Sequence, residues 1–252
     1  MKIKHYLMLA SASVAAFLAS SCDRSKEYNY ITNINGVADT TDSASPAETC
    51  DTLMAVDMGL SVKWASMNVG APRPELCGFI LSWGETEHKT TFTINSYKWY
   101  DKTSGEYTKY TKEDGLTALE AEDDAATLIL GEKWRTPTYE EMKELAQPAN
   151  CMWVYTEDYK GTGICGFNVY SNRTGNCIFI PLTGLFYDNS SVDYPYSNHV
   201  KPTSGYYWTA NSIFDDYSEN LVIDCYNSTP SICLSSKPKY YGAAIRAVTE
   251  DK

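Results

Sequence analysis

The sequence predicts an α+β fold in which mostly antiparallel strands are accompanied by one or two helices and long loops. Three observations lead to this class. Residues 139–146 carry an amphipathic helical pattern with its own start signal. Several strand-like segments are bounded by glycine and polar turns. No evenly spaced repeat of roughly 20–50 residues occurs, which argues against a solenoid or a propeller.

The N-terminus, residues 1–21, is predicted to be a bacterial lipoprotein signal peptide. Lys2 and Lys4 precede an apolar stretch that is too short to span a bilayer. The stretch ends in Leu-Ala-Ser-Ser-Cys, which resembles a lipobox and implies lipid attachment at Cys22. Leu18 lies one position farther from the cysteine than is usual, so an ordinary secretion signal is the alternative. The predicted location is the cell envelope, with the outer membrane favoured over the inner one, surface exposure left open and the lipid as the sole membrane anchor.

Residues 22–52 form a polar, acidic segment with few large apolar side chains. Such a segment cannot bury enough apolar surface to order itself, so it predicts a flexible tether. A strand around Tyr28–Ile34 is the alternative. The globular domain is expected over residues 53–252.

The domain opens with residues 55–71, whose alternating pattern predicts two strands on either side of a turn. A strand beginning at Gly78 follows and leads into a loop punctuated by aromatic residues. Residues 123–130 then predict a short helix that begins with aspartates.

The strongest helix signal covers residues 139–146. Thr138 is the predicted N-cap, and Glu141 three residues later completes a capping box. Apolar residues within the segment follow three- and four-residue spacing, so one narrow face is expected to be buried.

The remainder of the domain is predicted to be strands and turns. Residues 163–186 contain a hairpin whose turn, Asn172–Gly175, places Tyr170 rather than Cys165 opposite Cys177. No disulfide is therefore expected between these two cysteines. A polar loop is expected next, followed by three strands over residues 205–212, 219–226 and 242–248.

Charge and composition exclude several functions. The net charge is −11 and no basic cluster occurs outside the N-terminus, which argues against nucleic acid as a partner. Two of the three histidines lie outside the signal, and no Cys-x-x-Cys pair is present, so neither a metal nor a cofactor is predicted. The acidic group at Glu120, Glu122 and Asp123 lacks EF-hand spacing and is interpreted as a solvated surface rather than a calcium site.

Several motifs occur in one order along the chain: VDMGLSVKWASMNVGA, SWGETEHKTTFTINSYKW, EDDAATLILGEKWRTPTYEEMKEL, IFIPLTGLF, GYYWTANS and YYGAAIRAV. Together, from about Ala55 to Val248, they resemble the Fibrobacter succinogenes major paralogous domain of lipoproteins from Bacteroidetes-type bacteria. The resemblance implies a C-type-lectin-like fold related to formylglycine-generating-enzyme-like domains. It also implies a structural role for the strand-to-helix corner, formed by Trp134, Arg135, Pro137, Thr138 and Glu141, and for Trp208.

The resemblance further implies a loop-rich recognition face on a rigid scaffold. The segment between residues 208 and 245 is rich in Tyr, Asp, Asn and Ser, which are typical of adaptable binding surfaces. We therefore expect a non-catalytic protein that binds or adheres to an extracellular protein or glycan. The predicted contact residues are Phe214, Asp215, Asp216, Tyr217, Ser218, Tyr226, Asn227, Ser228, Thr229, Tyr240 and Tyr241.

Residues 211–236 include Glu219 but no Lys, Gln, Met or Trp. About five residues of these types would be expected from the composition. Proteins varied by diversity-generating retroelements show this exclusion, because pyrimidine-ending codons cannot encode those residues. A polar loop that lacks them by chance is the alternative.

Two other functions remain open at this stage. A structural or assembly subunit of a surface appendage is compatible with the pattern, although the N-terminal segment is poor in strand-forming residues. A formylglycine-generating-type catalyst is disfavoured, because Cys225 and Cys233 lie eight positions apart without basic neighbours.

Overall fold

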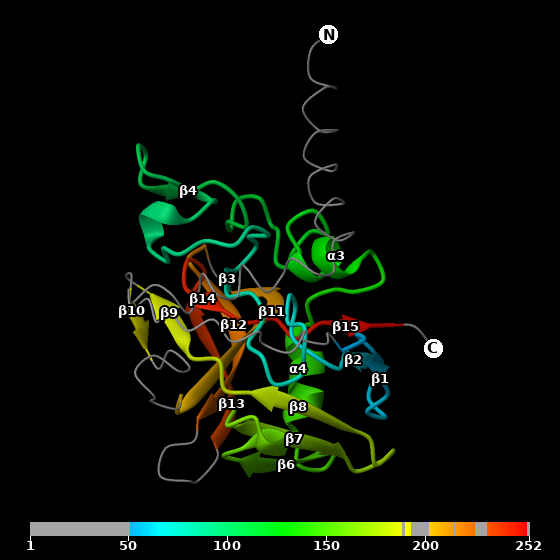
Figure 1. Cartoon of the computed structure of the whole chain (residues 1–252). Coiled ribbons are helices and arrows are strands. Elements are labelled where there is room, and N and C mark those ends of the chain that lie inside the picture. Colours follow the sequence, from blue (N-terminus) through cyan, green and yellow to red (C-terminus); the bar gives the residue numbers. More distant parts are fainter. Residues whose placement is uncertain (1–50, 188–189, 193–201, 214, 225–230, 251–252) are drawn as a thin grey trace, which may run out of the picture. The chain divides into compact units, whose positions relative to one another are not determined.

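The computed structural model describes residues 51–187, 190–192, 202–213, 215–224 and 231–250. The chain divides into two compact units, residues 1–50 and 51–252, and all described residues belong to the second. Within them, most regular structure is antiparallel strands in small sheets, with two α-helices (Figure 1). This arrangement agrees with the predicted α+β class.

One small sheet joins the two ends of the described chain. It contains β1 (Ala55–Val56), β2 (Lys63–Ala65) and β15 (Val248–Thr249), with β2 in the middle. Trp64 pairs with Val56 on one side and Val248 on the other, and its side chain is fully buried. The predicted strands on either side of a turn are therefore confirmed, although both are short.

The helix α4 (Tyr139–Ala146) begins as the sequence predicts. The Thr138 hydroxyl accepts a hydrogen bond from the Glu141 backbone, and the Glu141 carboxylate accepts one from the Thr138 backbone. Met142 and Leu145 are buried on its inner face. The helix α3 (Ala125–Leu130) is shorter than predicted, because Asp124 lies outside it as the N-cap.

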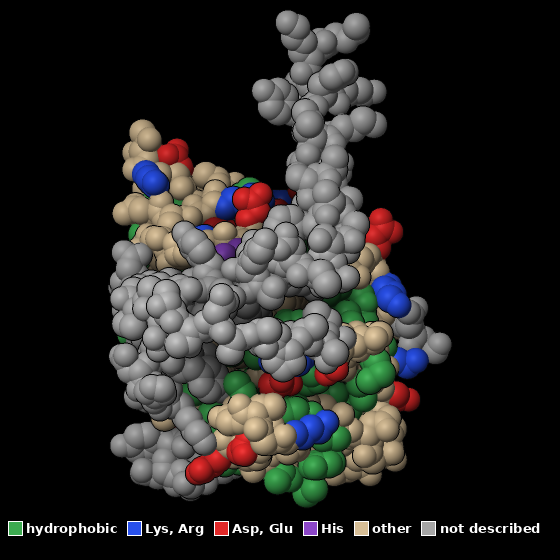
Figure 2. Space-filling model, viewed as in Figure 1, with side chains coloured by type: hydrophobic (Ala, Val, Ile, Leu, Met, Phe, Trp, Pro, Cys, Tyr) green, Lys and Arg blue, Asp and Glu red, His purple; other side chains and the backbone are tan. Residues whose placement is uncertain are grey.

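A three-stranded antiparallel sheet follows α4. Its strands are β6 (Cys151–Thr156), β7 (Gly166–Ser171) and β8 (Cys177–Pro181), with β7 central and the short 3-10 helix η2 (Tyr159–Gly161) between β6 and β7. Tyr170 pairs with Cys177, which confirms the predicted hairpin register. Figure 2 shows hydrophobic side chains gathered over β6 and β7, where Met152, Val154 and Tyr170 are exposed.

A second three-stranded sheet carries the C-terminal half. It contains β11 (Ser204–Ser212), β12 (Tyr217–Asp224) and β13 (Ser231–Pro238) in that order. The sequence predicts β11 and β12 but not β13, whose serine-rich residues resemble a polar loop. Leu221 and Ile223 of β12 are buried beneath the sheet.

Short strands complete the domain. A four-stranded sheet has the order β10 (Ser190–Val192), β9 (Leu185–Tyr187), β14 (Gly242–Ala243) and β3 (Leu81–Ser82). The 3-10 helix η1 (Ile94–Ser96) precedes a two-stranded hairpin of β4 (Tyr100–Asp101) and β5 (Glu106–Tyr107). In Figure 1 this hairpin and the β6–β7–β8 sheet lie at opposite ends of the domain.

Two apolar clusters form the core. One joins α4 to the β6–β7–β8 and β11–β12–β13 sheets, and the other surrounds Trp83, Trp134 and Trp208. Arg246 is buried and donates hydrogen bonds to the Asn68 side chain and to backbone carbonyls of β2 and β8. A buried cation that is fully hydrogen-bonded in this way holds separate strands in one geometry.

The strand-to-helix corner is held by buried aromatic residues, an ion pair and backbone hydrogen bonds. Trp134 and Trp208 are buried, and the Trp208 indole donates a hydrogen bond to the Leu81 carbonyl (2.8 Å). Arg135 makes a two-pronged ion pair with Glu141, with nitrogen–oxygen distances of 2.8 and 2.6 Å. The Pro137 carbonyl accepts a hydrogen bond from the backbone of β11. The corner therefore ties α4 to the rest of the domain.

Candidate ligand-binding face

The β4–β5 hairpin presents two tyrosines side by side. Tyr100 and Tyr107 are a cross-strand pair whose ring centroids lie 5.5 Å apart in an edge-to-face arrangement. Tyr97 lies beneath them, with its centroid 6.1 Å from that of Tyr107, and its hydroxyl donates a hydrogen bond to the buried carbonyl of Trp83. The half-buried hairpin rings are thus supported from below by a fixed aromatic residue.

The start of β12 lies against the turn that follows β13. Tyr217 pairs with Pro238, and the backbone N–H of Lys239 donates a hydrogen bond to the Asp216 carbonyl (2.9 Å). Asp216 is exposed, and Tyr217 retains 37% of its side-chain surface. These two residues consequently lie beside Tyr240, the residue after Lys239.

Electrostatic coupling joins the hairpin to this turn. The pKa of Tyr107 is raised, first by burial and then by Asp216, Tyr240, Tyr100 and Tyr217 in decreasing order. Hydrogen bonds also join the two segments, because the Lys239 ammonium donates to the Tyr110 carbonyl and the Asp215 carboxylate accepts from the Lys112 backbone. The hairpin and the turn therefore lie near one another. We name the resulting surface the tyrosine face and define it as Tyr100, Tyr107, Asp216, Tyr217, Tyr240 and Tyr241.

Stacked rings extend the tyrosine face toward β9. Tyr241 stacks on Tyr187 at a centroid distance of 5.0 Å and an interplanar angle of 19°, and Tyr240 meets Tyr241 edge-on at 5.0 Å. All three rings are half-buried. Tyrosines with fixed rings and accessible edges offer apolar contact area and hydroxyl groups at low entropic cost.

A buried lysine holds the loops beneath the tyrosine face. The Lys239 ammonium donates hydrogen bonds to the carbonyls of Tyr110 and Asp215, both at 2.9 Å, and lies 5.0 Å from the centroid of the Trp83 ring. Burial lowers the pKa of Lys239 to about 8, against the opposing effect of nearby aspartates. This side chain therefore positions the face rather than contacting a ligand.

The predicted contact residues have four outcomes, of which that of Ser218 is described separately. Asp216, Tyr217, Tyr240 and Tyr241 do come together in the tyrosine face, which leaves their role in binding as a prediction. Asp215 is half-buried, and its carboxylate accepts a hydrogen bond from the Lys112 backbone (2.7 Å). Phe214, Tyr226, Asn227, Ser228 and Thr229 lie outside the described residues, as does Cys22.

The prediction that Ser218 contacts a ligand is wrong. Its side chain is fully buried, and its hydroxyl donates a hydrogen bond to the Asn211 carbonyl on β11 (2.7 Å). Successive side chains of a strand point to opposite faces, so an exposed Tyr217 places Ser218 inward.

Tyr100 and Tyr107 are the residues that sequence reasoning missed. They lie more than a hundred positions before Tyr217, in a segment that was expected to be a loop. The turn between them contains Gly105 at a φ of 77°, a conformation that favours glycine. That glycine is the local signal that could have identified the hairpin.

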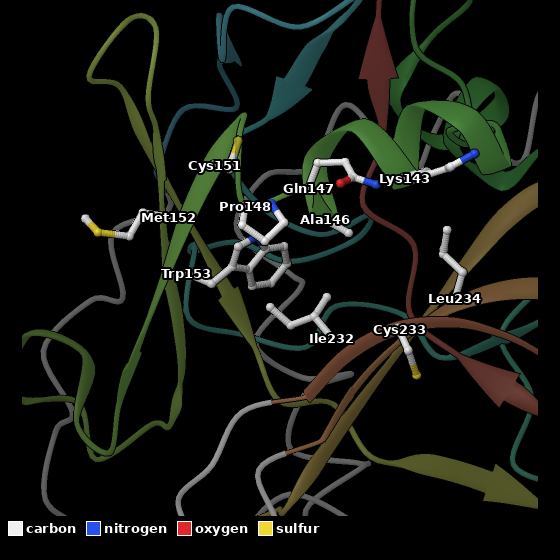
Figure 3. Close-up of a pocket in the computed structure, with 10 residues that line it drawn as sticks. All are labelled: Lys143, Ala146, Gln147, Pro148, Cys151, Met152, Trp153, Ile232, Cys233 and Leu234. Atoms are coloured by element: carbon white, nitrogen blue, oxygen red, sulfur yellow. The ribbon is translucent and has the colours of Figure 1, made fainter.

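A cavity of about 580 Å³ lies away from the tyrosine face, between the end of α4, β6 and β13 (Figure 3). Trp153, Ile232 and Leu234 give it apolar walls, and the Trp153 indole donates a hydrogen bond to the Leu145 carbonyl. Lys143, the one charged lining residue, pairs with Glu140. The lining thus offers few polar groups that could orient a small ligand.

The acidic group at Glu120, Glu122 and Asp123 converges on a lysine. The Lys109 ammonium lies 2.5 Å, 3.3 Å and 2.6 Å from these three carboxylates, respectively. Burial alone would lower the pKa of Lys109, but its hydrogen bonds to the acids raise it. The position that a metal ion would take among these carboxylates is occupied by the protein's own cation.

Two described thiols, on half-buried Cys77 and buried Cys151, are electrostatically unsuited to nucleophilic chemistry. Desolvation raises the pKa of Cys77 to about 12 and that of Cys151 to about 11. Thiols with such values carry almost no thiolate at neutral pH, and the thiolate is the reactive form.

Among the described helices, none is both long and apolar enough to span a membrane. No protein-family model, curated protein or solved structure matches the chain.

Proposed function

We propose that this chain is a non-catalytic recognition or adhesion protein that binds an extracellular ligand through its tyrosine face. The tyrosine face itself carries the proposal. It combines half-exposed tyrosine rings from the β4–β5 hairpin, the start of β12 and the turn before β14 with the exposed carboxylate of Asp216. Surfaces with this composition provide contact area and hydrogen bonds together.

The scaffold is proposed to be a C-type-lectin-like domain. Pairing of β2 with β15 supports this assignment, because it brings the first and last strands of the domain together. The capped α4 corner and the β11–β12–β13 sheet, whose edge leads into the tyrosine face, are further support. In this proposal the variable residues lie on loops while the sheets remain constant.

The domain is further proposed to be held at the cell envelope by a lipid on Cys22 and by the polar segment that follows it. The basic N-terminus, the short apolar stretch and the lipobox-like sequence support this. A tether of this length would hold the tyrosine face roughly 30 Å from the membrane on average. Such a spacing suits the capture of ligands outside the cell.

The proposal is tested with two adjacent substitutions in the full chain. Tyr217→Ala removes an exposed ring, whereas Ser218→Ala removes a buried hydroxyl and serves as the matched control. Both variants and the unmodified chain are applied to a glycan array and to a random-peptide phage library. We expect Tyr217→Ala to lower the signal of captured glycans or peptides about tenfold, as loss of a central aromatic contact does.

Ser218→Ala should retain capture while losing about 1 kcal/mol of unfolding free energy, because a buried hydrogen bond is removed. Urea unfolding checks this difference. Equal capture by Tyr217→Ala and the unmodified chain, or no capture by either, would contradict the proposed function.

A further inference from the structure

The exposed carboxylate of Asp216 lies within a group of aromatic rings. Tyr217 follows it directly, and the Lys239–Tyr240 turn is hydrogen-bonded to its backbone. Tyr107 is close enough for the Asp216 charge to act on its hydroxyl, and Tyr100 pairs with Tyr107 across the hairpin. Tyrosine residues of the β12 start, the following turn and the hairpin therefore lie in the neighbourhood of this negative charge.

Charges of both signs lie in the segments near this carboxylate. Residues 100–116, 213, 215–217 and 237–239 contain six carboxylates, from Asp101, Glu106, Glu113, Asp114, Asp215 and Asp216, and five ammonium groups, from Lys102, Lys109, Lys112, Lys237 and Lys239. The formal sum is −1, and the Lys109 ammonium is already paired with three carboxylates. The Lys239 ammonium is buried and hydrogen-bonded to two carbonyls, so it offers little positive charge to the surface.

Aromatic rings and a carboxylate together favour a cation. The faces of tyrosine rings attract ammonium and guanidinium groups, and the attraction strengthens where water is partly excluded. A neighbouring carboxylate accepts charge-assisted hydrogen bonds, and a guanidinium can donate two of them in a two-pronged geometry. A neutral sugar would gain stacking but no charge pairing from Asp216.

We propose that the tyrosine face binds an arginine or lysine side chain of a protein partner, between the Asp216 carboxylate and the rings of Tyr107 and Tyr217. This inference rests on the proposed function and names its ligand class. The net charge of −11 favours the same partner, because it attracts basic proteins at long range. Arginine is preferred over lysine, because its planar group stacks on tyrosine as well as pairing with a carboxylate.

The direct test measures binding of fluorescent peptides to the full chain by anisotropy. The probes are a peptide of alternating arginine and serine, its lysine counterpart and an all-serine peptide of equal length. Asp216→Asn removes the charge and preserves the shape of the side chain. Glu132→Gln removes an equally exposed charge next to the strand-to-helix corner, outside the tyrosine face, and is the matched control.

We expect the arginine peptide to bind at least about fivefold more tightly than the serine peptide. Asp216→Asn should abolish most of this preference, while Glu132→Gln should change it by less than about twofold, since an isolated exposed charge contributes little. Tyr217→Phe should retain binding and Tyr217→Ala should weaken it, because the ring provides the contact. If Asp216→Asn and Glu132→Gln lowered the preference for the arginine peptide equally, net charge alone would explain the preference, and the inference would be overturned.

The same variants separate this inference from the proposed function. If a glycan or neutral peptide is captured, is lost in Tyr217→Ala and is unaffected by Asp216→Asn, the cationic ligand class is wrong while the binding role stands. If neither Tyr217→Ala nor Asp216→Asn alters the binding of any probe, both proposals fail. Circular dichroism and urea unfolding of each variant establish that it is folded.

Discussion

At the scale of single residues, Arg135 links three parts of the chain. Its guanidinium pairs with Glu141 at the start of α4 and with Glu250 beyond β15 (3.0 Å). Its backbone forms a bridge with Val248. Because Glu141 also caps α4, one ion pair fixes the direction of the helix against the closing strand.

Arg135→Ala should lower the free energy of unfolding by about 1–3 kcal/mol, because the partly buried Glu141 loses two charge-assisted hydrogen bonds. Lys143→Ala removes an exposed ion pair with Glu140 on the same helix. This variant should change the free energy of unfolding by less than about 0.5 kcal/mol. Urea unfolding measures both. Equal changes in unfolding free energy for the two variants would show that Arg135 is an ordinary surface residue. Arg135→Ala should weaken peptide binding only slightly, because Arg135 lies outside the tyrosine face.

The roles of some single residues could be predicted from the sequence, and those of others could not. Thr138 and Glu141 could be assigned a structural role from the capping box, whose members lie three positions apart. The structural roles of Trp134 and Arg135 were implied by the family resemblance, since most of their partners lie far away in the sequence. The sequence could not show that Ser218 is buried while its neighbour Tyr217 is exposed, since the composition of this segment predicts an exposed surface for both. Only strand register decides which of two neighbours points outward, and that register depends on β11 and β13.

At the scale of elements, the turn after β13 depends on a buried charge. Lys239 donates to carbonyls in two other loops, so it ties the turn to residues 110 and 215. Its ordinary pKa of 10.5 falls to about 8 in the folded domain, chiefly through burial. Between these values the unfolded chain holds a proton that the folded domain has released, so this group makes stability rise with pH.

Lys239→Met should destabilise the domain by about 1–3 kcal/mol, because the carbonyls of Tyr110 and Asp215 lose their donor. The difference in unfolding free energy between the unmodified chain and this variant should widen from pH 8 to pH 10.5, as the buried amine becomes neutral. Lys237→Met, two positions earlier, should show no such widening. Urea unfolding across that range measures the trend, and a constant or shrinking difference would contradict it.

Elements with local signals were predictable and the others were not. The capping box located α4, and the turn at Asn172–Gly175 located the β7–β8 hairpin with its register. β13 was missed because its serines and cysteine suggest a loop, although Ile232 and Leu234 pack against the core. Its strand conformation comes from pairing with β12, which is a tertiary effect that overrides local preference.

At the scale of the whole domain, a very short strand holds the end of the described chain against its beginning. β15 contains two residues, yet Val248 is fully buried, pairs with Trp64 and bridges to Arg135. The described chain therefore begins and ends in one sheet. Removing this contact should affect both core clusters, since Val248 belongs to one and its neighbour Ala247 to the other.

Val248→Asp should abolish cooperative unfolding, because an unpaired carboxylate would be placed in the core at a cost of several kcal/mol. Val154→Asp makes the same change at an exposed position on β6 and should leave the melting transition nearly unchanged. Thermal unfolding followed by circular dichroism distinguishes them. A cooperative transition in Val248→Asp would mean that closure by β15 is dispensable.

Only part of the tyrosine face could be predicted from the sequence, because its residues come from segments that are far apart in the chain. Tyr217 and Tyr240 stood out because they lie in one polar, tyrosine-rich stretch. Tyr100 and Tyr107 join them only through the folded chain, across more than a hundred intervening residues. Local sequence patterns cannot predict that these distant segments lie near one another, since this depends on where the β4–β5 hairpin packs.

The Lys109 ammonium also neutralises a group of carboxylates that would otherwise repel one another. The oxygens of Glu120, Glu122 and Asp123 lie within 4.8 Å of one another, and the ammonium pairs with all three. A neutral side chain at position 109 would leave that repulsion unrelieved, so one lysine determines whether three carboxylates can share this small region of the surface.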